Sequence, residues 1–339
     1  MARRSARPSR RSPSSAEPPT SRGALPSGPV PIDTGTAEVL PDPDHSARMT
    51  LQVNGVPSSY LDLADPGFLA FEYMQQMNAV VCATTSGPLR ALHLGAAGCA
   101  LARCWDAERP GSRQVAVDID ARLVVLVREW FDLPRAPRLR LRADDAARAV
   151  ASAAPGSYDV VVRDVFAGDA TPEHLVTGET AEHVVKALRP GGIYLVNCAD
   201  RPPLARVRRE LATLAAAFGP DAVAEGRLAL VAEPGILKGR RYGNLVLAAV
   251  RSVSRPARAQ HAQTDVSPST DSRAGGGTGL PAAPGPEPGL SASQGPAIEP
   301  ETPDLSVPAL ARALRALPVP AQPVTGPGLE RFIATARPL

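Results

Sequence analysis

Cysteine is scarce in this chain of 339 residues, and no two cysteines have the spacing of a metal site. The four that occur are Cys82, Cys99, Cys104 and Cys198. They form no CxxC pair, and no cluster of histidines accompanies them. Isolated cysteines of this kind are typical of free thiols in a reducing compartment. We therefore expect a cytoplasmic protein that binds no metal.

Long apolar runs are also missing. No stretch reaches the roughly 18 apolar residues that a membrane-spanning helix needs. The beginning, MARRSARPSRRSPSS, is rich in Arg and Ser but has no apolar core, which argues against a secretory signal peptide. A transit peptide or a nucleic-acid-binding arm would share this composition, but we interpret it as a disordered tail. We expect no contact with a membrane.

An excess of charge of either sign is missing as well. With 37 basic and 34 acidic residues, the formal net charge is only +3. Such a balance gives no indication of a nucleic-acid partner. We therefore expect a small-molecule ligand and no nucleic acid.

Aliphatic residues are few in two stretches, which contain no aromatic residue. Residues 1–30 and 253–305 are dominated by Pro, Ser, Gly and Arg, so we expect both to be disordered. Between and after them we expect a small β element at 31–66, a main catalytic domain at 67–252, and C-terminal helices at 306–339. These helices are too short to fold alone, so we expect them to dock on the main domain.

Apolar segments alternate with amphipathic ones through the main domain. Seven of them are predicted as strands: LRALHLG, RQVAVDI, RLRLRA, YDVVVRD, GIYLVNC, RLALVAE and NLVLAAV. Helical stretches such as DARLVVLVREWF and TAEHVVKAL separate the first five. This order predicts an α/β fold with a seven-stranded, mostly parallel, doubly wound sheet. No helix separates the last two strands, which predicts an antiparallel hairpin at one edge.

Glycine or aspartate follows four successive predicted strands at the point where each strand ends. These residues are Gly95, Asp118, Asp120, Asp144, Asp145 and Asp164. Because ligands of open α/β sheets bind outside the carboxyl ends of the strands, we expect the whole set around one crevice.

Each position allows a chemical role. Gly95 lets a ligand approach the backbone. An acid that binds ribose hydroxyls lies about 20 residues after such a glycine turn, and Asp118 is close to that position. An acid after the third strand can accept from an adenine amino group, and Asp164 can take a proton from an attacking amine. Taken singly, the aspartates that follow the second and third strands could instead cap the next helix. As a set, these residues predict a nucleoside-binding site.

The glycine turn narrows the class of nucleoside. It reads GAAGCA from Gly95 and lacks the complete G-x-G-x-x-G pattern that cradles a pyrophosphate. An adenosyl sulfonium ligand has no phosphates and needs no such cradle. The turn therefore favours this class over a dinucleotide.

Several segments together resemble the spermidine synthase-like proteins, polyamine aminopropyltransferases with a methyltransferase-type Rossmann fold. The segments are TAEVLPDPD, MTLQVNGVPSSYLDLADP, LHLGAAG, VAVDID, YDVVVRDVFAGDATP, LRPGGIYLVN and RYGNLVLAAV. The resemblance, to a divergent branch common in high-GC bacteria, implies this fold with a small N-terminal β element. It implies aminopropyl transfer from decarboxylated S-adenosylmethionine, the donor co-substrate, to a diamine such as putrescine. It also implies a homodimer with no true cofactor.

The resemblance implies roles for individual residues. Asp118 matches the acid that binds the ribose, and Asp145 with Ala146 matches the pair that contacts adenine. Asp164 matches the aspartate that receives the amine proton, and Asp120 and Asp144 complete the predicted nucleoside site. For substrate binding we expect the residues Glu72, Tyr73 and Asp169.

Two departures from the family pattern leave alternatives open. The turn residues Ala96, Ala97 and Gly98 include no acid to meet the ammonium group of the donor. In DVFAGDATP, Asp169 lies two positions late for the second acid of the family's Asp-x-x-Asp-Pro loop. An S-adenosylmethionine-dependent methyltransferase and a non-catalytic nucleoside-binding relative are therefore the alternatives.

Overall fold

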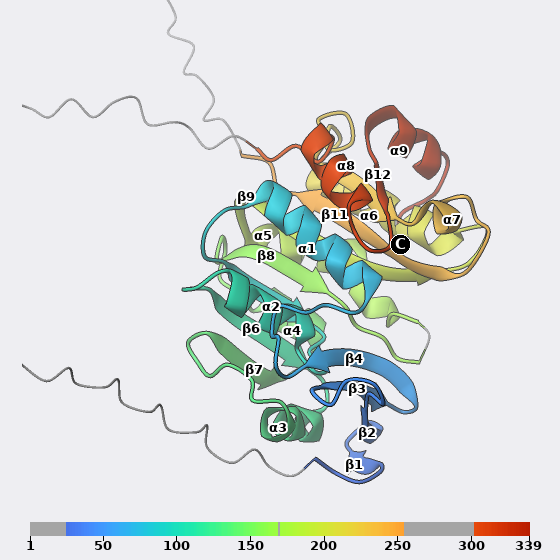
Figure 1. Cartoon of the computed structure of the whole chain (residues 1–339). Helices are drawn as coiled ribbons and strands as arrows, with labels where there is room; N and C mark the ends of the chain where they lie inside the picture. The colour runs from blue at the N-terminus through green and yellow to red at the C-terminus, as the bar shows by residue number, and fades with distance from the viewer. Residues whose placement is uncertain (1–24, 169, 254–301) are drawn as a thin grey trace, which may run out of the picture.

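The computed structural model describes residues 25–168, 170–253 and 302–339, which form two sheets with helices packed around the larger one (Figure 1). Most of the predicted disordered segments, 1–30 and 253–305, and the predicted site residue Asp169 lie outside the described residues. The predicted division into domains stays a prediction.

The larger sheet has the strand order β12-β10-β11-β9-β8-β5-β6-β7. Its strands are β5 (Arg90–Leu94), β6 (Arg113–Asp118), β7 (Leu139–Ala143), β8 (Tyr158–Arg163), β9 (Leu188–Asp200), β10 (Leu228–Ala232), β11 (Gly243–Val250) and β12 (Gln322–Val324). The five strands from β5 to β9 pair in parallel, and β10, β11 and β12 pair antiparallel. The predicted edge hairpin β10–β11 is therefore present.

The predicted strand count of seven is one too low for this sheet. The eighth strand, β12, has the sequence QPV and pairs with β10. Three residues that include a proline show no alternation, so the sequence carries no strand signal there.

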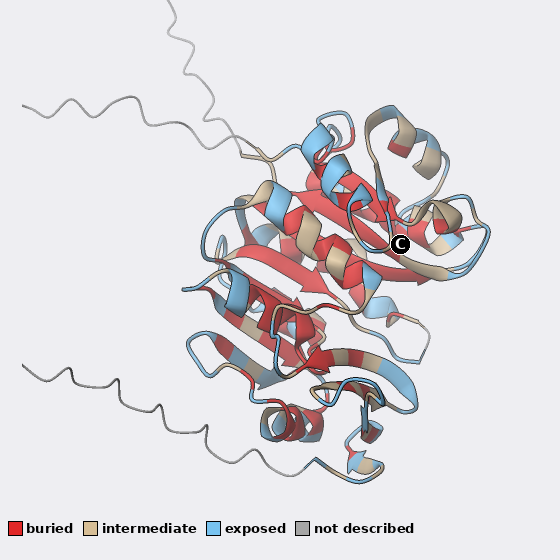
Figure 2. Cartoon of the chain, viewed as in Figure 1, coloured by how far each residue is buried: buried red, intermediate tan, exposed pale blue. Residues whose placement is uncertain are grey.

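Helices cover both faces of this sheet. They are α1 (Glu72–Thr84), α2 (Ala100–Glu108), α3 (Ala121–Trp130), α4 (Ala146–Ala151), α5 (Gly178–Ala187), α6 (Ala205–Phe218), α7 (Pro234–Leu237), α8 (Pro308–Arg315) and α9 (Gly326–Ile333), with a 3-10 turn, η1, at Glu173–Leu175. Buried residues of α1, α2, α3 and α8 form one core, and those of α4, α5, α6 and α9 form the other. Figure 2 shows the strands between them almost entirely buried.

The smaller sheet precedes α1 in the chain. It is an antiparallel meander of β1 (Val30–Ile32), β2 (Gly35–Pro41), β3 (Arg48–Val53) and β4 (Val56–Asp62). Asn54 and Gly55 both have positive φ angles in the β3–β4 turn, as the Asn-Gly pair favours. The meander gives the small N-terminal β element that the sequence predicts.

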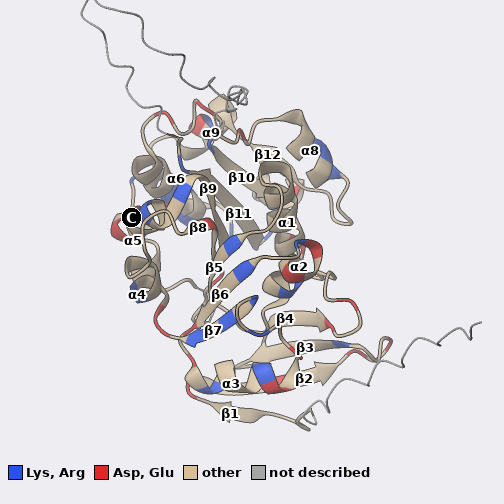
Figure 3. Cartoon of the chain, turned by 90° about the vertical axis from the view of Figure 1, so that its left-hand side faces the viewer, with Lys and Arg blue, Asp and Glu red and all other residues tan. Residues whose placement is uncertain are grey.

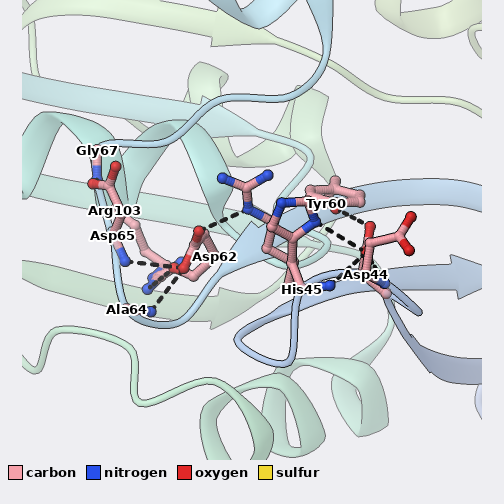
Figure 4. Close-up of polar contacts among 10 residues, drawn as sticks. Asp44, His45, Tyr60, Asp62, Ala64, Asp65, Gly67 and Arg103 are labelled. Carbon is pink, nitrogen blue, oxygen red and sulfur yellow. Dashed lines mark hydrogen bonds and ion pairs between the residues drawn. The ribbon is translucent and has the colours of Figure 1, made fainter.

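Asp62 holds the connection from the small sheet to α1, as Figure 4 shows. One carboxylate oxygen accepts from the backbone N–H of Ala64 and of Asp65, and the other accepts from Arg48 Nε at 2.9 Å. Arg103, buried on α2, donates to the backbone carbonyl of Asp62 at 3.1 Å. This network ties the end of β4 and the start of the connection to β3 and α2.

The segment after residue 302 packs on the main sheet. Leu310 and Leu314 of α8 are fully buried in the core that α1 also contributes to, and β12 extends the sheet. The backbone N–H of Val253 donates to Thr302 Oγ1 at 3.0 Å, so the two points that flank residues 254–301 lie together.

Replacing residues 254–301 by a short Gly-Ser linker should leave the fold intact. Because Val253 and Thr302 are already in contact, the linker spans the gap without strain. A shorter loop also costs less closure entropy, so we expect Tm to stay the same or rise by about a few degrees. Thermal unfolding followed by circular dichroism checks this. A Tm lower by more than about 5 °C would show that these residues stabilise the fold.

Candidate active site

Asp164 follows β8 directly and is held by two neighbouring side chains. Tyr73, from the first turn of α1, donates its hydroxyl to Asp164 Oδ2 at 2.8 Å. Asn197, from β9, donates its amide nitrogen to Asp164 Oδ1 at 2.9 Å. Each carboxylate oxygen therefore has one protein donor, and the carboxylate is fixed in orientation at the carboxyl edge of the sheet.

Burial determines the protonation behaviour of this group. The loss of water raises the pKa of Asp164 above its ordinary value, although the hydrogen bonds from Asn197 and Tyr73 lower it in part. Burial, and then the nearby Asp164 carboxylate, raise the pKa of Tyr73 well above its usual value, so this phenol stays protonated and remains a donor. A carboxylate with a raised pKa is a stronger base than an exposed aspartate.

Gly95 directly follows β5 and lies beside Asp164, and the structure explains why a glycine is needed there. Its φ is +92°, and a Cβ there would lie 2.1 Å from the carbonyl oxygen of Asp164. No other residue type fits without moving the backbone that carries Asp164. Gly95 therefore lets the glycine turn and the end of β8 approach each other closely.

Asp118 holds the glycine turn. Its Oδ2 accepts from the backbone N–H groups of Ala96 and Ala97 at 3.2 and 3.1 Å, and its Oδ1 accepts from the N–H of Asp120. Next in the turn, the N–H of Gly98 donates to Ser59 Oγ, a buried residue of β4, at 2.9 Å. The small sheet and the end of β6 thus shape the turn together.

Asp120 is buried between the small sheet and α3. One carboxylate oxygen caps α3 by accepting from the N–H of Leu123, and the other accepts from the N–H and hydroxyl of Thr34. The residue is almost fully buried. Its carboxylate connects the small sheet to α3. Of the two roles considered for Asp120, ligand of the nucleoside or cap of the next helix, the structure shows the helix cap.

Asp144 and Asp145 follow β7 with different partners. Asp144 is buried and forms ion pairs with Arg142 and Arg148. Asp145 caps α4 through the N–H of Arg148, and its other oxygen lies 3.1 Å from His174 Nε2. Burial raises the pKa of Asp145, but the bonds from Arg148 and His174 outweigh it, so the net shift is downward. Asp145 is the more accessible of the two acids, and Ala146 begins α4 beside it.

In the part of the chain that it describes, the structure shows no contact between the remaining predicted site residues and Asp164. Glu72 is exposed at the first position of α1, so it lies beside Tyr73 in the chain but does not share its contact with Asp164. Asp169 lies outside the described part of the chain.

Among the described residues, no three His, Cys, Asp or Glu side chains are grouped as they would be around a metal ion. No helix in this part of the chain is long and apolar enough to cross a membrane.

Sequence reasoning missed two residues at this edge. Asn197 holds Asp164, and its place at the end of the LRPGGIYLVN motif could have drawn attention to it. Ile119 is 63% exposed between Asp118 and Asp120, which is unusual for a large apolar residue. An exposed isoleucine beside the predicted ribose ligand offers an apolar surface for a nucleobase.

The fold defines an α/β protein with a methyltransferase-type Rossmann sheet, and the candidate site places several aspartates after strands at the carboxyl edge of that sheet. No model of a protein family matches the chain. A probable spermidine synthase from Corynebacterium glutamicum has a similar crystal structure, with a TM-score of 0.71 and 31% sequence identity. The similarity covers 93% of this chain and 96% of that one. The chain therefore belongs to the spermidine synthase-like family.

Two curated relatives have similar sequences over shorter segments. The polyamine aminopropyltransferase of Chromobacterium violaceum is 28% identical over 139 residues, which are 41% of this chain and 53% of that protein. The polyamine aminopropyltransferase of Thioalkalivibrio sulfidiphilus is 32% identical over 138 residues, which are 40% of this chain and 48% of that protein. The matched part of the chain thus spans about half the length of these curated relatives.

Proposed function

We propose that this protein transfers an aminopropyl group from decarboxylated S-adenosylmethionine to the primary amine of a small acceptor. The observation that carries the proposal is the Asp164 carboxylate, oriented by Tyr73 and Asn197 and with its pKa raised by burial. A base of this kind beside a nucleoside crevice suits the activation of an amine. Membership of the spermidine synthase-like family supports the same reaction.

The nucleoside part of the donor would lie along the ends of β5, β6 and β7. Asp118 would accept from the ribose hydroxyls, and the exposed Ile119 would pack against the adenine ring. Asp145 would accept from the adenine amino group, with Ala146 leaving room beside it. This arrangement needs no phosphate-binding loop, in keeping with the incomplete glycine pattern.

The reaction is an in-line displacement. Asp164 accepts a proton from the acceptor ammonium, and the freed nitrogen lone pair attacks the aminopropyl carbon bonded to the sulfonium sulfur. A new C–N bond forms, the C–S bond breaks, and its electron pair returns to sulfur to give neutral methylthioadenosine. The proton then leaves Asp164 to water. Orientation of both substrates and removal of the amine proton are the contributions of the protein.

Titration calorimetry with decarboxylated S-adenosylmethionine, and separately with S-adenosylmethionine, tests the donor. Tighter binding of the decarboxylated form, with methylthioadenosine released when an amine is added, is the expected result. Because Ala96, Ala97 and Gly98 offer no acid to the donor ammonium, preference for S-adenosylmethionine would instead favour a methyltransferase. If neither form of the donor bound, the proposal would be overturned.

The homodimer that the family resemblance implies stays a prediction.

Tyr73→Phe should shift the pH dependence of the reaction. The hydroxyl stabilises ionised Asp164, so its loss raises the pKa of this carboxylate further. Asp164 must be deprotonated to act as a base, and therefore the acidic limb of the kcat/KM profile moves to higher pH. Tyr60→Phe is the matched control, because Tyr60 donates to Asp42 instead. An unchanged limb in Tyr73→Phe would show that the hydrogen bond does not tune Asp164.

A further inference from the structure

His174 lies beside the carboxylate of Asp145, the residue that the proposed function gives to the nucleobase. It belongs to the 3-10 turn η1, and its Nε2 lies 3.1 Å from Asp145 Oδ2. The net shift of the Asp145 pKa is downward, so this carboxylate is ionised at neutral pH and carries no hydrogen. The hydrogen of this contact is therefore on His174 Nε2, and the imidazole is the donor.

Both oxygens of the Asp145 carboxylate are held by this arrangement. Oδ1 accepts from the backbone N–H of Arg148 at 2.9 Å, and Oδ2 accepts from His174. Two donors fix the plane of a carboxylate, whereas a single donor leaves it free to turn about the Cβ–Cγ bond. Each carboxylate oxygen has two lone pairs, so Oδ2 keeps one for a ligand. Because the Asp145 side chain is 33% exposed, a ligand can reach it.

The backbone that carries His174 is anchored on the protein. Thr180 Oγ1, in the first turn of α5, donates to the backbone carbonyl of His174 at 2.8 Å. Arg163, which is buried with Glu210, donates to the carbonyl of the next residue, Leu175, at 3.0 Å. Leu175 is itself buried in the core. The imidazole therefore starts from a fixed backbone, and its contact with Asp145 costs less conformational entropy.

The fold brings η1 to the helix that Asp145 caps. Figure 3 shows α4 and α5 next to each other on one side of the sheet, and η1 precedes α5 in the chain. Residues of η1 and α4 also lie close together. The segment between β8 and α5 begins with Asp164 and contains His174 further along. One connection thus supplies the proposed base and a partner for the proposed nucleobase ligand.

A fixed, ionised carboxylate discriminates between purines. The exocyclic amino group of adenine donates to it, whereas the carbonyl oxygen of hypoxanthine at the same position brings lone pairs against lone pairs. The neighbouring acid Asp144 is engaged in ion pairs with Arg142 and Arg148, so it does not take over this role. The strength of the discrimination therefore depends on how firmly Asp145 is oriented.

We propose that His174 is a positioning residue for nucleobase specificity, which donates to Asp145 and so holds that carboxylate toward the adenine amino group. This inference rests on the proposed function, which places adenine at Asp145, and it adds the residue that sharpens the choice of base. His174 acts through Asp145 and not on the reacting atoms. Its loss should therefore weaken donor binding and leave the chemical step unchanged.

Two nucleosides that differ at the 6-position of the purine test this proposal. Titration calorimetry with the full chain measures Kd for methylthioadenosine, the nucleoside product of the proposed reaction, and for methylthioinosine, which has a carbonyl in place of the amino group. We expect the wild-type protein to prefer methylthioadenosine by at least about thirtyfold. His174→Ala should lower this ratio at least about threefold, because the released carboxylate can turn away from the base.

Two further variants identify the cause of the change. His174→Gln keeps an N–H donor near the position of Nε2 and should keep the wild-type ratio. His45→Ala is the matched control, because His45 Nδ1 lies 3.3 Å from Asp42 Oδ1 in the small sheet. The exposure of its side chain is 54%, against 55% for His174. This control should also keep the wild-type ratio.

Steady-state kinetics with decarboxylated S-adenosylmethionine as the varied substrate give a second readout. His174→Ala should raise KM for this donor at least about threefold and keep kcat within about twofold of wild type. A loss of kcat at unchanged KM would contradict a role in positioning the nucleobase.

The outcomes separate this proposal from the proposed function. A smaller change of the ratio in His174→Ala, or an equal loss in His174→Gln or His45→Ala, would overturn the role of His174 and leave aminopropyl transfer intact. If the wild-type protein bound neither nucleoside, the adenine site at Asp145 would be wrong, and the proposed function and the role of His174 would both be overturned.

Discussion

Asp164→Asn is expected to lower kcat by about a thousandfold while leaving the affinity for the donor within about threefold of wild type. The substitution removes the base but keeps the shape of the side chain. Its amide oxygen can still accept from Tyr73. Once the Asn197 amide turns over, the new amide nitrogen can donate to Asn197 Oδ1, which has no hydrogen-bond partner among the described residues of the wild-type protein. The fold and the nucleoside pocket are therefore retained. Single-turnover release of methylthioadenosine and calorimetry with the donor measure the two effects separately.

Asp159→Asn is the matched control for this substitution. Asp159 is a buried aspartate near the start of the same strand, β8, where it accepts from the N–H of Arg90 and pairs with Arg189. We expect this variant to lose stability but to keep kcat within about threefold, because its carboxylate is far from the carboxyl edge. If Asp164→Asn retained a tenth or more of the wild-type kcat, Asp164 would not be the proton acceptor.

The largest loss of stability is expected from Arg163→Met. Arg163 is the last residue of β8 and directly precedes Asp164; its guanidinium lies 2.5 Å from Glu210 Oε2 of α6. It also donates to the backbone carbonyl of Leu175 at 3.0 Å. Both charged side chains are almost fully buried. Removing one partner leaves the Glu210 carboxylate buried and unpaired, which costs about 3–5 kcal/mol and lowers Tm by about 10 °C or more.

Urea and thermal unfolding measure this loss. The double variant Arg163→Met, Glu210→Leu is the control, since it removes both charges and replaces them by apolar groups. We expect it to recover most of the stability that the single variant loses, because the cost arises from the isolated charge and not from the missing bond. A single variant that lost less than about 1 kcal/mol would mean that water or another group compensates Glu210.

The class of fold and the edge at which the candidate site residues lie could be predicted from local patterns. The apolar runs that end in Gly95, Asp118, Asp145 and Asp164 predict parallel strands with their polar ends at one edge, and the structure brings these ends to one edge. The strand β12 was not predicted, because its three residues show no alternation and form a strand only by pairing with β10. Long-range pairing of this kind has no local signal.

The partners of each side chain could not be read in the same way. Asp118 and Asp120 have the same residue type and nearly the same position, yet Asp118 holds the glycine turn while Asp120 binds Thr34 of the small sheet. Tyr73 and Glu72 are neighbours, but only the helix direction decides that Tyr73 reaches Asp164. Asn197 reaches the same carboxylate from a strand that lies 33 positions later in the chain.

By itself, the sequence determined the class of the fold, the edge of the sheet at which the site lies and the residue types present there, because periodicity and glycine or aspartate at strand ends are local properties of the chain. Only the tertiary structure decided which oxygens are engaged and that the pKa of Asp164 lies above its ordinary value. Burial, hydrogen bonding and electrostatic fields depend on groups that are distant in the chain and meet only when it folds.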